Sequence, residues 1–398
     1  MASKKEQIKI RFIDRIAKID SKKWDELARL LPTPLLEWHW LHQLEASGSI
    51  TPETGWQPCH LTVWSENRLV GAAPLYIKTH SIGEFVFDHI WAEIALQIGV
   101  RYYPKLVGMS PVTPIMGYRF LIAADHDQSA MARLMLAAID QFCLENDLSG
   151  ANFLFVDPAW EAELAAAGYV AWRHQSFAWK NNNFSNFDDF LGIFKTNQRR
   201  NINRERRRML RQGIVLEPFL GDQIPSDFID PMYRFYSHTN ARFGPYGCHF
   251  LTPEFFHGIY VDFKKRLFFV AAFDKSNRKK PLAMSMLLVK ANQMIGRYWG
   301  ANTNIKDLHF NVCYYTPIDW AICNNIHHFD PGAGSSHKIR RGFKAVVNHS
   351  FHRFFDSKMA HLLKKHMASV NRLSQNKIDE LNAQSPIKKN MLANTKKV

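Results

Sequence analysis

Two segments of the chain repeat one strand–turn–strand pattern at a distance of 210 residues. Gln57–Trp64 and Leu69–Lys78 are apolar runs joined by a polar turn, and Leu267–Phe273 and Pro281–Lys290 flank a second polar turn. Apolar runs of this length between polar turns are typical of β-hairpins. Helical patterns precede both hairpins, so the repeat favours two α/β domains in tandem over a coincidence of patterns that are common in mixed folds.

The spacing of apolar residues in the rest of the chain predicts the other helices and strands. We expect helices over residues 21–31, 35–44, 129–145, 187–194, 196–211, 228–239, 253–263 and 308–324, and further strands over 151–156, 294–301 and 327–330. Pro317 is expected to kink the helix that contains it. The prediction is an N-terminal domain over 8–175, a C-terminal domain over 176–357, and a basic, partly helical or disordered tail over 358–398.

Composition excludes several classes of protein. The 398 residues are 46% apolar and 22% charged, which is globular rather than disordered. No run reaches the roughly 18 apolar residues of a membrane helix, and no apolar segment of a secretory signal follows the lysine-rich start. Five cysteines without paired spacing favour buried thiols and a cytoplasmic location.

The charge is concentrated in two places. Lys and Arg exceed Asp and Glu by 15, and an excess of this size favours polyanionic partners over a merely basic surface. Residues 195–211 hold eight basic residues against Glu205, and residues 358–398 hold nine against two acids. Each segment therefore has a net charge of +7, which together accounts for nearly all of the excess.

The first basic segment has the spacing of one helical face. Its arginines recur at i, i+4, i+7/8 and i+11, and the expected donor-phosphate ligands are Arg200, Arg204, Arg207, Arg208 and Arg211. Guanidinium groups suit phosphate geometry, and so many like charges on one helix require an anion to compensate them. The alternative is a solvated face that pairs with acidic surface elsewhere.

Some apparent motifs do not have the context they need. Arg68–Ala73 has the letters R-x-x-G-x-A of an acetyltransferase phosphate loop, but it lies inside the first hairpin and is expected to be a strand. His39 and His42 stand three apart on a helix without further ligands at matching spacing, so we expect no metal site. The chain also has neither a G-x-S-x-G nor a Walker A motif.

Residues 294–352 hold the densest group of unusual side chains. The stretch contains Arg297-Tyr298-Trp299, an aromatic segment around His309, the glycine-rich turn 331–334, and then His337 to Lys344. A glycine-rich turn after a strand, followed by histidine and cations, can hold a polyanion or a polarised carbonyl. A structural turn with scattered surface charge would look similar.

The chain resembles the FemAB-like predicted N-acyltransferases of the GNAT superfamily, which are described as peptidoglycan biosynthesis or recognition proteins. The resemblance covers about residues 10–355. The segments that carry it include Glu37–Trp40, Tyr102–Leu106, Arg199–Arg208, Gly296–Gly300, Leu308–Phe310 and His337–Ile339. It implies two tandem GNAT-like domains with mixed central sheets, with the active site in the second.

The resemblance also implies roles for individual residues. His309 or His337 would relay a proton, and Lys344 (in a Phe-Lys pair) or Arg341 would stabilise the oxyanion. The expected substrate-binding residues are Arg297, Tyr298, Trp299, Asn311, Tyr315, Arg340 and Arg341. Two positions depart from the family pattern, because Asn311 and Ser336 stand where carboxylates are usual, which puts a carboxylate base in doubt.

The implied reaction is transfer of an acyl or aminoacyl group from an activated carrier to an amine of a small molecule, peptide or cell-wall precursor. The carrier is aminoacyl-tRNA or acyl-coenzyme A, with no tightly bound cofactor, and the clustered arginines favour tRNA modestly. One alternative is a non-catalytic RNA- or envelope-associated protein on a transferase fold. The weakest alternative is a peripheral membrane protein held by the basic tail.

Overall fold

The computed structural model describes residues 8–244 and 247–388, which divide into two compact units. The first unit contains the residues up to His174 together with Phe250–Phe255 and Val347–Gln375, and the second contains Gln175–His249, Phe256–Val346 and the residues from Asn376. None of the helices in the described ranges is both long enough and apolar enough to cross a bilayer.

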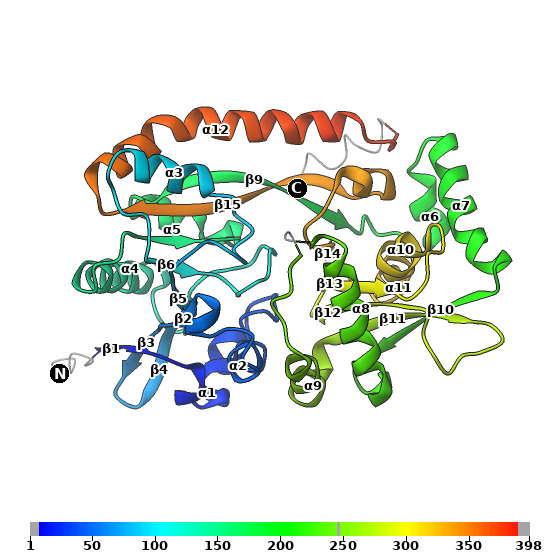
Figure 1. Cartoon of the computed structure of the whole chain (residues 1–398), viewed down its shortest axis with the longest axis horizontal. Helices are drawn as coiled ribbons and strands as arrows, with labels where there is room; N and C mark the ends of the chain where they lie inside the picture. Colours follow the sequence, from blue (N-terminus) through cyan, green and yellow to red (C-terminus); the bar gives the residue numbers. More distant parts are fainter. Residues whose placement is uncertain (1–7, 245–246, 389–398) are drawn as a thin grey trace. The chain divides into compact units, whose positions relative to one another are not determined.

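The first unit is built mainly from the N-terminal half of the chain (Figure 1). Its elements are β1 (Ile8–Ile13), α1 (Ser21–Ala28), α2 (Trp38–Ala46), β2 (Trp56–Pro58), β3 (His60–Ser65), β4 (Arg68–Ala73), β5 (Leu75–Lys78), α3 (His89–Gln97), β6 (Lys105–Gly108), β7 (Leu121–Ile122), α4 (Gln128–Glu145), β8 (Gly150–Phe153) and α5 (Glu161–Ala166). Strands β1, β3, β4 and β7 form one sheet in that order, and β2, β5, β6 and β8 form part of another.

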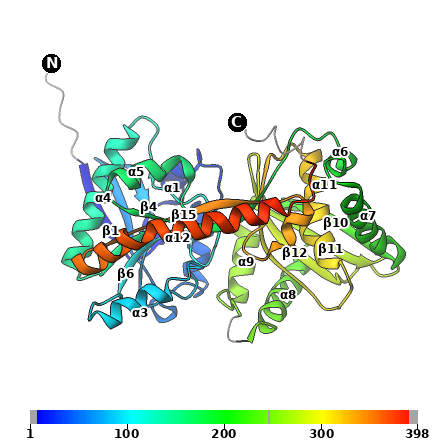
Figure 2. The same ribbon diagram turned by 90° about the horizontal axis from the view of Figure 1, so that it is seen from above.

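The second unit contains the other part of this larger mixed sheet, in which β10 to β14 lie in chain order and β14 pairs with β9 (Val170–Lys180). Its elements are α6 (Phe187–Gly192), α7 (Thr196–Arg211), β10 (Ile214–Leu220), α8 (Ile229–Ala241), α9 (Pro253–Asp262), β11 (Leu267–Asp274), β12 (Ala283–Lys290), β13 (Gln293–Ala301), α10 (Leu308–Phe310), the π-helix η8 (Asn311–Tyr315), α11 (Thr316–Cys323), β14 (His328–Asp330) and the 3-10 helix η9 (Ser336–Arg341). Figure 2 shows α7 and α11 at the β10 end of this sheet.

The same order of pairings occurs in both units. In the first unit, β5 pairs antiparallel with β6, and β6 pairs parallel with β8 after the helix α4. In the second unit, β12 pairs antiparallel with β13, and β13 pairs parallel with β14 after the helices α10 and α11. The predicted tandem of α/β domains with mixed sheets is therefore present.

Helices cover both faces of the strands in the second unit. Phe268 of β11 packs against Trp320 of α11 with tilted rings whose centroids are 4.4 Å apart. The ring of Phe273 lies 6.0 Å from that of Phe228, which directly precedes α8. Residues of opposite parity on one strand point to opposite faces, so α11 and α8 lie on different sides of the sheet. The burial of every residue from Leu267 to Phe273 agrees with this arrangement.

Several local predictions are confirmed. Helix α7 has the predicted bounds, and both hairpins form, as β3–β4 and β11–β12. Arg68–Ala73 is strand β4, as expected from its place in the hairpin, and not a phosphate-binding loop.

The structure adds detail in segments where the prediction was incomplete. The boundary predicted between residues 175 and 176 falls inside the strand β9 (Val170–Lys180). Within the segment predicted as a partly helical or disordered tail, the described residues are mostly the helix α12 (Ser357–Ala383). Met359, Leu363 and Met367 of α12 pack into a core cluster of the first unit. Strand β15 (Lys344–Phe354) was not predicted, and Pro317 lies in the first turn of α11, which begins at Thr316.

Candidate functional site

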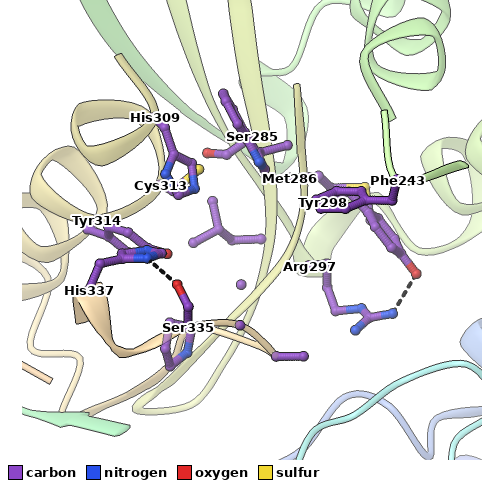
Figure 3. A pocket seen from close by; sticks show the side chains of 16 residues that line it. Phe243, Ser285, Met286, Arg297, Tyr298, His309, Cys313, Tyr314, Ser335 and His337 are labelled. Carbon is purple, nitrogen blue, oxygen red and sulfur yellow. Dashed lines mark hydrogen bonds between the residues drawn. The ribbon is translucent and has the colours of Figure 1, made fainter. Parts of the chain in front are cut away.

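A pocket of about 380 Å³ opens in the second unit, between β12, β13, the helical segment that starts at Leu308 and the glycine-rich loop (Figure 3). Of the residues expected to form the site, it brings together His309, His337, Arg297, Tyr298 and Trp299. The rest of its lining is Phe243, Ser285, Met286, Leu287, Gly296, Cys313, Tyr314, Pro331, Ala333, Gly334 and Ser335.

A β-bulge shapes the strand wall of the pocket. Met286 pairs with Tyr298 while the next residue, Leu287, pairs with Gly296, so Arg297 is an extra residue in β13. Bulges bend a strand and redirect its side chains, and they are common next to active sites. The guanidinium of Arg297 donates to the Tyr298 hydroxyl at 2.5 Å, which fixes the cation at one side of the pocket.

Strand β13 also depends on a close approach to a helix. A Cβ added at Gly300 would lie 2.1 Å from the carbonyl oxygen of Phe235 in α8. Only glycine allows the strand and the helix to lie this close. Thr239, one turn further along α8, donates its hydroxyl to the carbonyl of Trp299 at 2.9 Å and holds the pocket end of β13 in place.

The opposite wall begins with a π-helical segment. Residues 308–310 are α-helical, and residues 311–315 form η8, which contributes Cys313 and Tyr314 to the pocket. Such π-segments occur frequently at functional sites. Ser285 of β12 donates its hydroxyl to the carbonyl of Val312 at 2.8 Å, and the ring of His309 lies 4.3 Å from that of Trp299. These contacts join the helical wall to the strand wall.

The glycine-rich loop is organised by a buried lysine. Lys338 is 1% exposed, and its ammonium group donates to the carbonyls of Gly332 and Ala333 at 2.6 and 2.9 Å. The amide of Gly332 donates to the carboxylate of Asp330 at 2.9 Å. Burial lowers the pKa of Lys338 to about 8. A cation that is held by loop carbonyls fixes the loop against the pocket.

His337 stands between two hydroxyl groups at the pocket. Its Nδ1 lies 2.6 Å from Ser335 Oγ and its Nε2 lies 3.1 Å from the Tyr314 hydroxyl (Figure 3). Arg341 donates to the backbone carbonyl of His337 at 3.0 Å. Both ring nitrogens therefore have hydrogen-bond partners in the neutral imidazole, and the ring is oriented from two sides.

Both pocket histidines are held in the neutral form. Burial, together with the positive charges of Arg341 and Lys338, lowers the pKa of His337 to about 4. Burial and the neighbouring His337, Lys338 and Arg341 lower the pKa of His309 to about 3. At neutral pH both rings can therefore accept a proton.

Three of the expected substrate-binding residues do not line the pocket but contact Glu205 of α7. Arg341 is buried, pairs with Glu205 of α7 at 3.0 Å, and stacks on the ring of Phe310 at 3.5 Å. Tyr315 donates its hydroxyl to the same carboxylate, and the buried Asn311 donates to the carbonyls of Asp307 and Glu205. None of the three belongs to the pocket lining, so their contacts give them positioning roles.

Lys344 also differs from expectation. It lies half-buried at the start of β15 and is not among the residues that line the pocket. Burial and the nearby Lys180 lower its pKa. An oxyanion role that requires Lys344 beside the histidines does not follow from this placement.

The five predicted phosphate-binding arginines separate into two groups. Arg200 and Arg204 line a second, shallower depression of about 390 Å³ beside Asn197 and Asn201 on α7, called the arginine groove. Arg340, which was expected to bind the substrate, lines this groove and not the pocket. The other three of the five lie outside the groove. Arg208 pairs with the carboxylate of Asp307, while Arg207 and Arg211 are exposed further along α7.

The arginine groove and the pocket share the short helix η9. His337 lines the pocket and Arg340, three residues later, lines the groove. A rise of about 2.0 Å per residue in a 3-10 helix separates the two backbone positions by about 6 Å along the axis. Gln198 of α7 donates to the carbonyl of Arg340 at 2.7 Å and attaches η9 to α7.

Sequence reasoning missed Ser335, Tyr314, Cys313 and Lys338 as parts of the site. Ser335 and Tyr314 adjoin residues that were singled out, but hydroxyl residues are too common to stand out without a partner. Lys338 lies in a run of surface-like charges, and only its contacts show that it is buried.

Comparison with solved structures shows the fold. FemX is 12% identical with a TM-score of 0.52, covering 87% of this chain and 98% of that chain. The C-terminal domain of a putative lysylphosphatidylglycerol synthetase from Agrobacterium fabrum is 10% identical with a TM-score of 0.51, covering 89% and 97%. The predicted fold class, α/β with two tandem domains and mixed central sheets, is confirmed.

Two sequence comparisons complete the assignment. No curated protein sequence matches the chain. The profile of the FemAB-like family, described as peptidoglycan biosynthesis/recognition, matches residues 15–389. The match covers almost the whole of both units, and the chain therefore belongs to the FemAB-like family.

Proposed function

We propose that the chain is an N-acyltransferase that moves an acyl or aminoacyl group from a phosphate-bearing carrier to an amine. The observation that supports this most strongly is His337, which is neutral at pH 7, oriented through both ring nitrogens and faces the pocket beside the glycine-rich loop. FemAB-like membership and a FemX-like fold agree with the proposal.

In the proposed reaction the amine nitrogen attacks the acyl carbonyl carbon. A C–N bond forms, the C–O or C–S bond to the carrier breaks, and one proton passes from the amine to the carrier oxygen or sulfur. We assign this proton to a relay in which it passes from the amine through Ser335 Oγ to Nδ1 of His337 and returns through the same hydroxyl to the carrier oxygen or sulfur. Throughout the relay, Nε2–H of His337 donates a hydrogen bond to the Tyr314 hydroxyl. Lys338 is a positioning residue, since it holds the loop that carries Ser335.

The arginine groove is the proposed site for phosphates of the carrier. Arg200, Arg204 and Arg340 present three guanidinium groups to one depression, with the amides of Asn197 and Asn201 beside them. Such a set suits the oxygens of a phosphate backbone or of coenzyme A. Binding the carrier in the groove and the acyl group in the pocket would hold the acyl carbonyl close to the acceptor amine, which lowers the entropic cost of their reaction.

Transfer to hydroxylamine tests the proposal without knowledge of the natural acceptor. Purified protein would be incubated with labelled aminoacyl-tRNA or acyl-coenzyme A, and acyl hydroxamate would be measured above the uncatalysed rate. We expect formation with at least one carrier, and a loss of about 10²-fold or more in His337→Gln. His327→Gln, which alters an exposed histidine outside the pocket, is the matched control.

Two results would reject parts of the proposal. Equal rates in wild type and His337→Gln would reject the proton relay. Binding of tRNA that weakens with salt, without transfer from any carrier, would favour the alternative of a non-catalytic RNA-binding protein.

A further inference from the structure

The pocket combines an apolar lining with nearby positive charge. Met286, Leu287, Trp299 and Phe243 contribute apolar or aromatic surface. Three cations adjoin this lining: Arg297 lies in it, Lys338 is bonded to the carbonyl of Ala333, and Arg341 is bonded to the carbonyl of His337.

The acidic groups on the elements that form the pocket have partners away from its interior. Glu205 pairs with Arg341, Asp307 pairs with Arg208, and Asp319 of α11 pairs with Arg206 at 2.9 Å. Asp330 accepts the amide of Gly332 within the loop, and its negative charge partly offsets the effect of burial on the pKa of Lys338, which burial still lowers to about 8. The described residues that line the pocket include cations but no carboxylate.

The pKa values of the two pocket histidines are lowered in part by these neighbouring positive charges. After burial, the causes that lower the pKa of His337 are the charges of Arg341 and Lys338. For His309 they are His337, Lys338 and Arg341. An added positive charge on a bound molecule would meet the same repulsion, because it would occupy the same partly desolvated space.

We infer that the acyl group taken by this pocket is apolar and carries no ammonium group. This inference rests on the proposed function and names its substrate class. An aminoacyl group with a free α-ammonium would place a second cation beside Arg297 and the loop held by Lys338, whereas an uncharged acyl chain would contact Met286 and Trp299 without that cost.

The positive charges beside the pocket also favour the neutral, reactive form of the acceptor amine. A nearby positive charge lowers the pKa of an amine, so a larger fraction of the nucleophile is neutral at pH 7. The cations that exclude a charged acyl group would therefore also assist attack by the amine.

Matched donors that differ only in the amino group test the inference. The first pair is 3-phenylpropanoyl-coenzyme A and phenylalanyl-coenzyme A, and the second is N-acetylphenylalanyl-tRNA and phenylalanyl-tRNA. We expect the uncharged member of a pair to be transferred at least about tenfold faster on whichever carrier is used. Equal or faster transfer of the charged member would overturn the inference and leave the proposed function standing.

Binding measurements keep the inference testable when no donor reacts. Calorimetry would compare the N-methylamides of 3-phenylpropanoate and phenylalanine at pH 6, where the latter is charged. Tighter binding of the uncharged amide supports the inference, and equal or weaker binding contradicts it. Absence of transfer from all four donors would reject the proposed function separately.

One position in the loop offers a paired variant. Ala333 lines the pocket with an exposed side chain that takes no part in the proposed relay. Ala333→Asp should reduce the preference for the uncharged amide at least about threefold, whereas the isosteric Ala333→Asn should leave it unchanged. The same effect in both variants would show that the preference is not electrostatic.

Discussion

His337 and Lys338 are neighbours in the sequence but have opposite environments. His337 faces the pocket with both nitrogens hydrogen-bonded, whereas Lys338 points into the protein and holds the carbonyls of the glycine-rich loop. The sequence made His337 and His309 candidates because both lie in segments that carry the family resemblance and because histidine titrates near neutral pH. It could not identify Lys338, because burial of a lysine depends on carbonyls that only the folded loop brings together.

The low pKa of His337 predicts an unusual pH profile. His337 is neutral above about pH 4. The acid limb of kcat/KM, with rates corrected to the neutral fraction of the acceptor amine, should therefore lie near pH 4 instead of near the ordinary value of 6.5. Between pH 6.5 and 4 the unfolded chain binds a proton that the native His337 does not, so native stability should also fall as the pH falls. Unfolding is therefore measured in parallel at each pH.

The variant Lys338→Met tests whether the acid limb of the activity profile belongs to His337 and not to a loss of native stability at low pH. Removing the buried charge should raise the pKa of His337 and move the acid limb upward, because Lys338 is one of the charges that lower it. A profile that keeps its acid limb near pH 4 in a folded Lys338→Met variant would contradict the assignment of that limb to His337.

At the scale of elements, the walls of the pocket are formed by irregular segments, namely a π-helical segment and a β-bulge. Periodicity located α7 and both hairpins, but it placed one helix over residues 308–324, where the structure has α10, the π-segment η8 and α11. The bulge at Arg297 and the strands β9 and β15 were also missed. Side chains in β9 are mostly half-buried, and apolar and polar residues occur in blocks instead of alternating, so the pattern that marks a one-sided strand is absent.

Gly300 should be intolerant of even one added carbon. Gly300→Ala places a Cβ against the backbone of Phe235, and we expect a loss of about 2 kcal/mol or more in the free energy of unfolding. Gly192→Ala in α6 is the control, since its Cβ would meet nothing within 4 Å. Urea denaturation of both variants checks this, and equal stabilities would contradict the packing of α8 on β13.

Helix α7 allows a charge-matched test of the arginine groove. Arg200→Glu with Arg204→Glu should raise the KM for the carrier about tenfold or more and lower the salt dependence of binding. Arg207→Glu with Arg211→Glu makes the same change in net charge on the same helix outside the groove and should have a smaller effect. Equal effects would show that α7 acts only through its overall charge.

At the scale of the whole molecule, both units use one order of strands, and three long elements contribute residues to both. Strands β9 and β15 and helix α12 are divided between the units. The tandem was predictable because each hairpin has its own apolar runs and turn. The packing of α12 was not, because its many lysines and arginines favoured a basic tail, partly helical or disordered, over a helix packed on a core.

Removal of the C-terminal segment should therefore affect folding. Deleting residues 358–398 removes Met359, Leu363 and Met367 from the core of the first unit, and we expect a loss of several kcal/mol or insoluble protein. Lys364→Gln with Lys365→Gln removes two exposed charges of α12 and should leave the melting temperature within a few degrees of wild type. A stable, cooperatively folded deletion variant would contradict the assignment of α12 to the core.

The central claim is that acyl transfer takes place in the pocket of the second unit. Its most direct test is a crystal structure with a donor analogue in which a methylene group replaces the ester oxygen or thioester sulfur. We predict that the acyl carbonyl lies within about 4 Å of Ser335 Oγ, with carrier phosphates on Arg200, Arg204 or Arg340. An analogue bound in the first unit, with this pocket empty, would contradict the claim.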